Sequence, residues 1–455
     1  MSEAGQVLVG DCMEALQSLP EGSVHCCVTS PPYYRLRDYG DPRQVGTEET
    51  VEAYVVRLVE VFRLVRRALR PDGTLWLNLG DSYTGGSRTP DDSVDLKHGM
   101  RDHARRIASD VSGQLLGIPW RVALALQADG WVLRSDVVWA KRNCLPESVA
   151  GWRWVPCRVK VGASRPGGQK SAEVGHRSKQ HGNLEDQPSV TWERCSGCPR
   201  CEPGGGFVLR RGSWRPTRAH EFVFMLAPSP SYYSSGEQVR EPHTHFQARP
   251  HGHRRRRPGP ELQEHVWEGT ARSSSGPDGD PAGRNLRDVW HLSSHPSKLH
   301  HYAMMPPVLV EKCLLAGCPE LACGQCGRPY APQVDRQTYR SISGERSMDK
   351  THCGVVRAGW RRGGPAGSCF GLRACCTCGA DPVPGTVLDP FLGAGTVAGV
   401  AEHLGRRWVG VELNPDYAAL LPARVEEVLA YYARRQDRRP KPAAGLPEPR
   451  QLGLF

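Results

Sequence analysis

The sequence predicts an α/β fold built on a doubly wound, mostly parallel sheet, and three observations lead to this prediction. Apolar segments of strand length alternate with segments of helical periodicity near both ends of the chain, over residues 6–140 and 387–434. A glycine-rich turn follows one short apolar strand. A proline-rich turn follows another. Turns of both kinds are expected at the carboxyl edge of a parallel sheet, where such folds place their sites.

In the N-terminal part, residues 6–10 predict a strand, residues 13–19 a helix that ends at Pro20, and residues 25–29 a buried strand. Residues 50–70 carry apolar side chains at helical spacing and stop before Pro71-Asp72-Gly73. The remaining elements expected in this half and the adjoining middle are a strand at 74–79, a helix at 117–128, one or two strands at 131–140 and a strand at 222–226.

The C-terminal part repeats the alternation, with a strand at 387–389, a helix at 396–404, a strand at 408–413 and a helix at 416–434. Within the N-terminal part and between the two parts lie polar stretches, which predict loops because they offer little apolar surface to bury. These stretches are residues 85–106, 161–187, 240–284 and 336–367, and a basic, proline-rich tail at 434–455 is expected to be disordered.

The composition narrows the class of partner and the setting. A formal net charge of +11 over 455 residues favours a polyanionic partner, because Lys and Arg release counterions from phosphates. No run of 18 apolar residues and no signal peptide is found, so we expect no membrane association and a cytoplasmic location. In that compartment, 17 cysteines predict metal ligands more readily than disulfides.

The glycine-rich turn is Asp389-Pro390-Phe391-Leu392-Gly393-Ala394-Gly395-Thr396, between a strand and a helix. Its glycines permit close approach of a ligand to the backbone, and the helix N-terminus favours a carboxylate. The next strand ends at Glu412, which can accept hydrogen bonds from ribose hydroxyls. This order predicts a nucleotide-like cofactor, and the alternative is a glycine-rich turn of some other α/β fold.

The proline-rich turn is Ser30-Pro31-Pro32-Tyr33, directly after the strand that ends at Thr29. Its two prolines hold backbone carbonyls in fixed directions. The Ser30 hydroxyl and the Pro31 carbonyl can accept hydrogen bonds from an amino group, and Tyr33 offers a stacking face for a base taken out of a duplex. Without the other motif, an ordinary turn is an equally good interpretation.

Together the two motifs resemble the DNA methyltransferases that modify exocyclic amines. The Ser-Pro-Pro-Tyr turn precedes the Phe-x-Gly-x-Gly turn, an order similar to that of the permuted β class. Three further segments resemble the same family: Asp11, which would contact the cofactor's adenine; residues 137–143, which would flank the base pocket; and residues 301–306, with Met304 and Pro306, which would close over methionine. Arg37-Asp38-Tyr39-Gly40 also fits the family.

This resemblance implies direct transfer of a methyl group from S-adenosylmethionine to the amine of a flipped base in double-stranded DNA. Hydrogen bonds to Ser30 and to the Pro31 carbonyl would restore the amine's nucleophilicity. A cysteine nucleophile, as ring-carbon methylation needs, is not expected at Pro156-Cys157, which lacks a glycine-rich context. The implied setting is a prokaryotic cell or its phage, at the nucleoid, with the oligomeric state and a cognate restriction endonuclease left open.

Three functional alternatives remain at this point. Ser30 with Thr29 before it resembles the N4-cytosine enzymes, whereas N6-adenine enzymes more often carry Asp or Asn there, so N4-cytosine is expected and N6-adenine is the alternative. A zinc-containing DNA-binding protein on an inactive methyltransferase scaffold is a second alternative, against which both intact motifs argue. A methyltransferase of RNA or protein amines is the third.

Cysteine spacing predicts two structural zinc sites. Cys195, Cys198 and Cys201 offer three thiolates within seven residues, with Cys157 as the nearest upstream fourth ligand. Separately, Cys323-x2-Cys326 and Cys375-x2-Cys378 form two knuckles, although Cys376 lies next to Cys375. The alternative is a set of free thiols in loops.

A basic stretch between these cysteines predicts DNA contacts through Arg210, Arg211, Trp214, Arg215 and Arg218, the alternative being a solvated loop. We therefore expect a catalytic half at 1–150, a target-recognition region at 151–285, a cofactor-binding half at 286–317 and 381–433, and a zinc-knuckle insertion at 318–380. The basic tail at 434–455 completes the chain.

Overall fold

The computed structural model describes residues 5–36, 39, 41–84, 113–144, 151–161, 191–242, 284–294, 304–334 and 369–437. The loops expected at 85–106 and 336–367, and most of those at 161–187 and 240–284, lie outside the described residues. The chain separates into two compact units, one of Met1–Asn143 with His220–Phe455 and one of Cys144–Ala219. No described helix has the length and apolar character that crossing a membrane requires.

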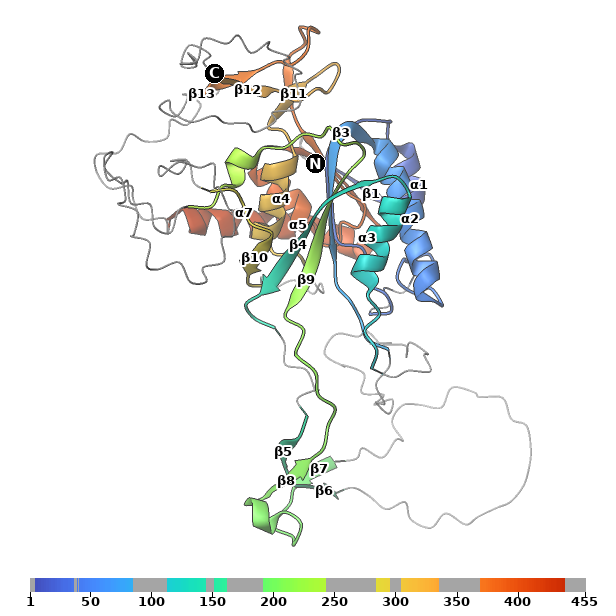
Figure 1. Cartoon of the computed structure of the whole chain (residues 1–455), viewed down its shortest axis with the longest axis vertical. Helices are drawn as coiled ribbons and strands as arrows, with labels where there is room; N and C mark the ends of the chain where they lie inside the picture. Colours follow the sequence, from blue (N-terminus) through green and yellow to red (C-terminus); the bar gives the residue numbers. More distant parts are fainter. Residues whose placement is uncertain are drawn as a thin grey trace, which may run out of the picture. The chain divides into compact units, whose positions relative to one another are not determined.

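The first unit is organised around one eight-stranded sheet (Figure 1). Seven strands are parallel and β9 alone runs against them, so the expectation of a mostly parallel sheet is confirmed. In order across the sheet the strands are β1 (Gly5–Val9), β16 (Arg407–Glu412), β15 (Thr386–Asp389), β2 (Val24–Thr29), β3 (Leu69–Leu79), β9 (His220–Ala227), β4 (Val132–Lys141) and β10 (Val289–Leu292).

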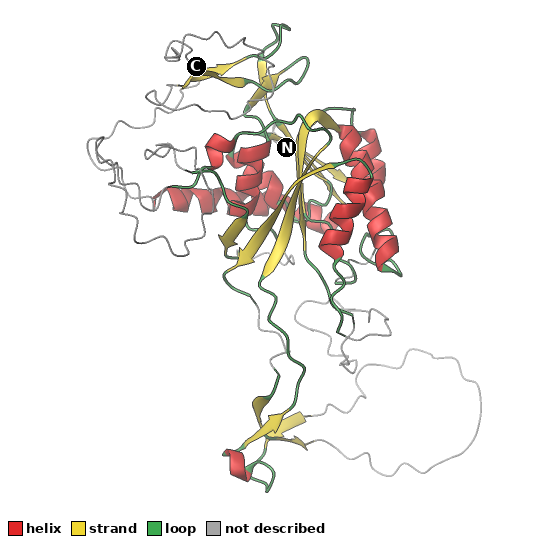
Figure 2. Ribbon diagram, viewed as in Figure 1, coloured by secondary structure: helices red, strands yellow, loops and turns green. Residues whose placement is uncertain are grey.

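Helices cover both faces of this sheet (Figure 2). One face packs against α1 (Cys12–Ser18), α2 (Val51–Ala68) and α3 (Ile118–Ala128), and the other against α4 (Pro307–Gly317), α5 (Thr396–His403) and α7 (Leu421–Asp437). Each helix turns an apolar stripe inward; in α2 this stripe contains Tyr54, Leu58, Phe62 and Val65, all fully buried. The fold is therefore doubly wound around two apolar layers.

Several element boundaries differ from the sequence-based expectation. The single helix expected at 416–434 is two helices, α6 (Pro415–Ala419) and α7, because Pro415 and Pro422 each begin a new helical turn. Since α7 continues to Asp437, the start of the predicted disordered tail is helical. Strand β3 begins at Leu69 rather than at residue 74, and its register against β2 shifts between Val24 and Cys26 to accommodate the extra residues.

Short antiparallel pairs make up the remaining described structure. The unit of Cys144–Ala219 contains β5 (Arg153–Pro156) paired with β8 (Phe207–Arg210), and β6 (Arg158–Val161) paired with β7 (Thr191–Arg194). In the larger unit, β11 (Leu321–Cys323) pairs with β14 (Pro382–Pro384) and β12 (Ala331–Val334) with β13 (Cys369–Arg373). The smaller unit is shorter than the region expected at 151–285, because β9 is an inner strand of the central sheet.

Candidate functional site

The two sequence motifs meet at the carboxyl edge of the sheet. Strands β2 and β15 are neighbours, with Cys26 beside Val387 and Cys27 beside Leu388, so the turns that follow them start side by side. The Thr29 hydroxyl donates a 2.6 Å hydrogen bond to Asp389 Oδ1, 360 residues further along the chain. The turns therefore have a fixed relative position, as a shared site requires.

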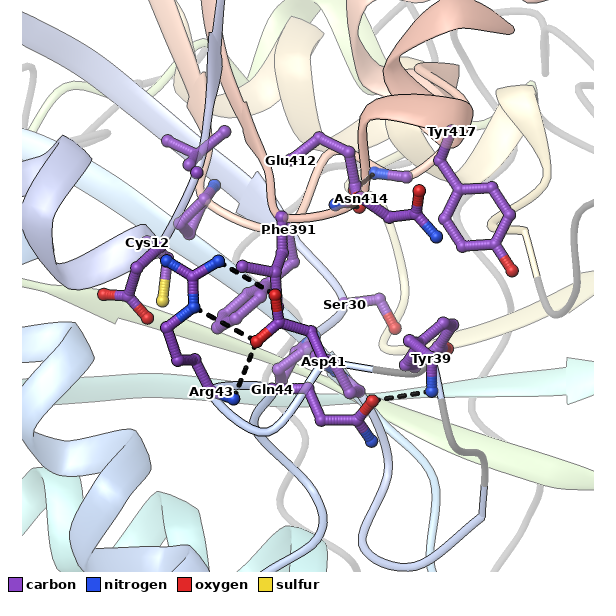
Figure 3. Close-up of a pocket in the computed structure, with 18 of the residues that line it drawn as sticks. Cys12, Ser30, Tyr39, Asp41, Arg43, Gln44, Phe391, Glu412, Asn414 and Tyr417 are labelled. Carbon is purple, nitrogen blue, oxygen red and sulfur yellow. Dashed lines mark hydrogen bonds and ion pairs between the residues drawn. The ribbon is translucent and has the colours of Figure 1, made fainter. Parts of the chain in front are cut away.

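One pocket takes residues from both motifs (Figure 3). Its lining includes the whole Ser30–Tyr33 turn from one side, and Pro390, Phe391 and Gly393 from the other. Asp11 and Glu412, from the ends of β1 and β16, complete the set of predicted residues that line it. The remaining lining residues are Gly10, Cys12, Leu36, Tyr39, Asp41, Arg43, Gln44, Val411, Leu413, Asn414 and Tyr417.

Backbone amides hold two of the pocket's carboxylates, Glu412 and Asp11. Glu412 accepts hydrogen bonds from the amides of Gly393 (2.8 Å, to Oε2) and Asn414 (2.9 Å, to Oε1). Burial raises the pKa of the Glu412 carboxyl above its ordinary value, while these amides act in the opposite direction. Asp11 accepts from the amide of Met13 (2.8 Å) as the N-cap of α1. Both acids are thus held in one orientation at the pocket wall.

Five predicted cofactor residues are not part of the pocket lining. Asp389 is buried, accepts from Thr29 and from the Phe391 amide (3.1 Å), and burial raises its pKa to about 7. Thr396 accepts from the fully buried Arg424 guanidinium at 3.1 Å, which ties α5 to α7. Gly395 adopts φ 100° as the N-cap of α5. Met304 and Pro306 lie just before α4, with Pro306 as its N-cap.

Asp389, Gly395, Thr396 and Pro306 therefore shape the turn and the helices around the pocket rather than its wall, and Met304 precedes α4. At Gly395 an added Cβ would lie 2.1 Å from Leu421 Cδ1, so the glycine permits close packing of α7. The sequence motif combines residues that line the pocket with residues that shape the turn, and spacing alone does not separate the two groups.

Much of the pocket's polar wall comes from residues that no sequence motif indicated. In the loop after the Ser30–Tyr33 turn, Arg43 Nη2 lies 2.8 Å from Asp41 Oδ2, and the Tyr39 amide donates to Gln44 Oε1 at 2.6 Å (Figure 3). The Tyr39 ring lies edge-on to that of Tyr417, with ring centroids 6.0 Å apart. Of these residues only Tyr39, in the run Arg37–Gly40, carried a signal in the sequence. Asp41, Arg43 and Gln44 lie in a loop without periodicity, and Tyr417 lies in α6.

In the Ser30–Tyr33 turn, Tyr33 is held by groups from the middle of the sheet. Its hydroxyl donates to Glu221 Oε2 at 2.6 Å and lies 3.0 Å from Asn78 Nδ2. Lys141 Nζ contacts the other oxygen of Glu221. Burial, followed by the nearby Glu221 carboxylate, raises the pKa of Tyr33 well above its usual value. Asn78 and Glu221 carried no signal in the sequence, and Lys141 was expected only as part of residues 137–143, which resemble the strand and turn flanking the base pocket.

Four cysteine thiols gather in the smaller unit, as spacing predicted. Cys157 follows β5, Cys195 follows β7, and the Sγ atoms of Cys198 and Cys201 lie 3.6 Å apart. The distances Cys157–Cys198 and Cys195–Cys201 are 4.0 and 3.9 Å between sulfurs. A tetrahedral zinc with bonds of about 2.3 Å needs sulfurs about 3.8 Å apart, so this donor set fits the ion.

A second group of four thiols belongs to the larger unit, and its membership corrects one prediction. Cys323, Cys326, Cys376 and Cys378 have sulfurs within 4.8 Å of one another. Cys375, which was expected in place of Cys376, is not in the group; its thiol is buried and points to the Arg373 carbonyl. Because the chain turns after β13, the side chain of residue 376, not that of 375, faces the first knuckle.

The predicted DNA-contacting residues all lie in the smaller unit, with different exposure. Arg210 ends β8 and Arg211 places its guanidinium 5.8 Å from the centre of the Trp152 ring. Trp214 is 72% exposed, whereas Arg215 and Arg218 are half-buried. Trp152 and Trp154, which the sequence analysis missed, are 62% and 61% exposed. Large aromatic side chains so exposed, beside arginines, are typical of a binding surface.

Comparison with known proteins gives consistent matches. A family described as DNA methylase, N6_N4_Mtase, matches residues 24–322 and 380–422, more than half of the chain. The type II methyltransferase M.SmaI of Serratia marcescens is 29% identical over 422 residues, covering 92% of this chain and 90% of that protein. M.Cfr9I of Citrobacter freundii is also 29% identical, with coverages of 92% and 86%.

Among solved structures, the PvuII DNA methyltransferase, named as cytosine-N4-specific, aligns with a TM-score of 0.45 and 14% identity. That alignment covers 96% of this chain and 94% of the PvuII chain.

Proposed function

The chain belongs to the DNA methylase family of N4-cytosine and N6-adenine methyltransferases, and we propose that it methylates N4 of a flipped cytosine in double-stranded DNA. S-adenosylmethionine, when bound, supplies an electrophilic methyl group to the amine. The observation that carries the proposal is the single pocket lined by Ser30 of one motif and by Gly393 and Glu412 of the other.

Within this pocket, one set of residues is proposed to bind the cofactor and another to bind the target amine. We infer that Glu412 and the Pro390–Gly393 turn hold the cofactor's ribose and methionine ends, with Asp11 near its base. The Ser30 hydroxyl and the Pro31 carbonyl accept hydrogen bonds from the target amine, which draws its lone pair out of conjugation with the ring. The Pro32 carbonyl accepts from the Tyr54 hydroxyl at 2.8 Å, so the turn is fixed before substrate arrives.

The choice of cytosine rests on the first residue of the catalytic turn. Ser30 is a short acceptor, preceded by Thr29, whose hydroxyl is already committed to Asp389. This pattern resembles the N4-cytosine members of the family. Both amines suit the same two acceptors, so the product base is the direct test of this part of the proposal.

We further propose that each four-cysteine group binds one structural zinc ion. Backbone amides of Cys201 and Arg200 lower the pKa of Cys198 to about 7, and amides of Cys326 and Gln325 lower that of Cys323 to about 6. Thiolates are the form that binds zinc. In the smaller unit the ion would join β5, β7 and the turn before β8, and so would support the surface that carries Trp152, Trp154 and Trp214.

We assign DNA contact to this surface. Its arginines suit phosphates and its exposed tryptophans suit a base step or a sugar face. Named relatives of the chain are type II methyltransferases, a class paired with restriction endonucleases, so a cognate endonuclease is proposed as the functional partner.

The experiment is incubation of the purified protein with unmethylated duplex DNA and S-adenosylmethionine, followed by mass spectrometry of the nucleosides. We expect N4-methylcytosine to appear. N6-methyladenine in its place would correct the base and leave the reaction class intact. No modified nucleoside would reject the proposed activity, and a lack of saturable cofactor binding as well would favour a non-catalytic DNA-binding protein.

A further inference from the structure

A partly buried carboxylate, Glu221, lies behind the Ser30–Tyr33 turn and is bound by side chains from three other segments. Its Oε2 accepts from Tyr33 Oη at 2.6 Å and from Asn78 Nδ2 at 3.0 Å, and its Oε1 contacts Lys141 Nζ. The Glu221 side chain is 12% exposed and that of Lys141 is 25% exposed. Sheet order explains the cluster, because β3, β9 and β4, which carry Asn78, Glu221 and Lys141, are neighbours.

A continuous line of hydrogen-bonding groups connects this carboxylate to the pocket. The Ser30 hydroxyl lines the pocket, and its Oγ lies 3.5 Å from Tyr33 Oη, which in turn donates to Glu221. Asn78 Nδ2 is within donor distance of all three oxygens, at 3.4 Å from Ser30 Oγ and 3.0 Å from the other two. As an amide donor, it favours hydroxyl protons that point along the line toward Glu221.

The reaction requires an outlet for a proton. Transfer of a methyl group to a neutral amine leaves the nitrogen positively charged until one N–H proton departs. Ser30 can accept that proton only if it releases its own, and a buried tyrosine with a raised pKa does not keep a negative charge. The Glu221 carboxylate at the end of the line is the group there that can accept the proton.

We propose that Glu221 is the terminal proton acceptor of a relay that runs from the target amine through Ser30 and Tyr33. The inference rests on the proposed methyltransferase function and assigns how its proton leaves. The amine N–H bond breaks and its electron pair stays on nitrogen, while Ser30 Oγ gains the proton. The Ser30 proton passes to Tyr33 Oη, and the Tyr33 proton to Glu221 Oε2, which becomes a neutral acid. Lys141 contacts the other oxygen of this carboxylate from the more exposed side.

The competing role for Glu221 is to position Tyr33 without accepting a proton. Glu221→Gln separates the two, because the amide oxygen of Gln still accepts from the Tyr33 hydroxyl but does not retain a proton. Tyr33→Phe is the second arm, since it keeps the ring and removes the hydroxyl that links Ser30 to Glu221. Among the described residues in contact with the carboxylate, Tyr33 and Lys141 are the titratable ones.

The experiment is single-turnover methyl transfer to duplex DNA at saturating S-adenosylmethionine, measured from pH 6.5 to 9. We expect E221Q and Y33F each to slow transfer by about 100-fold or more, as loss of an acid–base group does, with binding of cofactor and DNA unchanged. The double variant should be no slower than either single one. In E221Q the rate should rise steeply with pH as solvent base replaces the carboxylate, whereas wild type should be flatter.

Glu241→Gln is the matched control, because Glu241 is a carboxylate of similar exposure (18%) held by Arg284 and Arg287 away from the pocket. It should leave transfer unchanged. If E221Q transfers at the wild-type rate, or is slow without a steeper pH profile, the relay is rejected and the methyltransferase assignment stands. If E221Q does not fold, a wild-type rate in Y33F rejects the relay. Wild-type protein that methylates no DNA rejects both.

Discussion

Thr29 Oγ1 and Asp389 Oδ1 form a 2.6 Å hydrogen bond that joins the catalytic turn to the cofactor turn. Both residues are buried, and Asp389 also accepts from the Phe391 amide. Under the proposed function, the bond would fix the distance across which the methyl group passes. A 1 Å error in such a distance slows transfer strongly, which gives a buried side-chain contact a direct effect on rate.

Thr29→Val should reveal this effect. The substitution keeps the shape of the side chain and leaves a buried carboxyl short of one partner, at a cost of about 1–3 kcal/mol in the free energy of unfolding. We expect a lower urea midpoint and slower methyl transfer. Thr47→Val, at an exposed loop hydroxyl, is the control and should change neither. Equal stability of the two variants would contradict the role given to the Thr29–Asp389 bond.

Ser30→Ala should remove transfer while leaving the cofactor bound. The variant lacks the hydroxyl acceptor for the target amine, and a loss of roughly 100-fold or more in single-turnover rate is expected. Titration with S-adenosylmethionine should give a dissociation constant within a few-fold of wild type, because the Glu412 side of the pocket is intact. Ser18→Ala, at an exposed helix position, is the control. A normal rate in the Ser30 variant would show that the catalytic turn is misassigned.

Gly80→Ala should displace the Tyr33 ring. A Cβ at residue 80 would lie 2.4 Å from Tyr33 Cε2, closer than any van der Waals contact allows. We expect slower transfer and a weaker Tyr33–Glu221 bond, with near-normal cofactor affinity. At Gly236 an added Cβ meets nothing within 4 Å, so Gly236→Ala tests whether a methyl group elsewhere in the unit has any effect. If Gly80→Ala and Gly236→Ala transfer the methyl group at the same rate, close packing of residue 80 against the Tyr33 ring is contradicted.

His25 should make stability depend on pH. Its Nε2 lies 2.9 Å from the Gly327 carbonyl and its Nδ1 accepts from the Thr386 amide, so both ring nitrogens are used by the neutral form. Burial lowers its pKa from 6.5 to about 4. Because the folded pKa is the lower one, this stabilisation is present above pH 6.5 and is lost as the pH falls toward 4.

Between pH 7 and 5 the loss from His25 should be roughly 2 kcal/mol in the free energy of unfolding. His25→Gln removes the titration, so the variant's stability should fall by correspondingly less over the same interval. The measurement is urea unfolding at several pH values. The slope of the free energy of unfolding against pH is then compared between wild type and variant. Parallel slopes would show that His25 already has its ordinary pKa in the folded protein.

Cysteine substitutions should decide the ligands of the second zinc site. Wild type is expected to carry two zinc ions per chain, Cys376→Ser about one, and Cys375→Ser two, because only Cys376 belongs to the thiol group. Elemental analysis of the purified proteins gives the count, and loss of the ion should lower thermal stability. Metal loss on substitution of Cys375 instead of Cys376 would restore the spacing-based assignment.

The sequence by itself determined the alternating architecture and the two motif turns. A Pro-Pro turn after a buried strand, and a Gly-x-Gly turn before a helix, carry their local geometry in a few adjacent residues, so Ser30–Tyr33 and Pro390–Gly393 were found without coordinates. The strand–helix order then predicted that both turns lie at one sheet edge. Boundaries such as the break between α6 and α7 were less well predicted, because proline can begin a helix as well as end one.

Only the tertiary structure decided which side chains complete the site. Glu221 reaches Tyr33 across 188 residues of chain because β9 inserts between β3 and β4, and no local pattern specifies that insertion. The tertiary structure also distinguishes Gly393 and Glu412, which line the pocket, from Gly395 and Thr396, which face α7. The physical reason is the same in each case: contacts between distant segments depend on strand order and on the direction of each side chain, and neither is encoded by spacing along the chain.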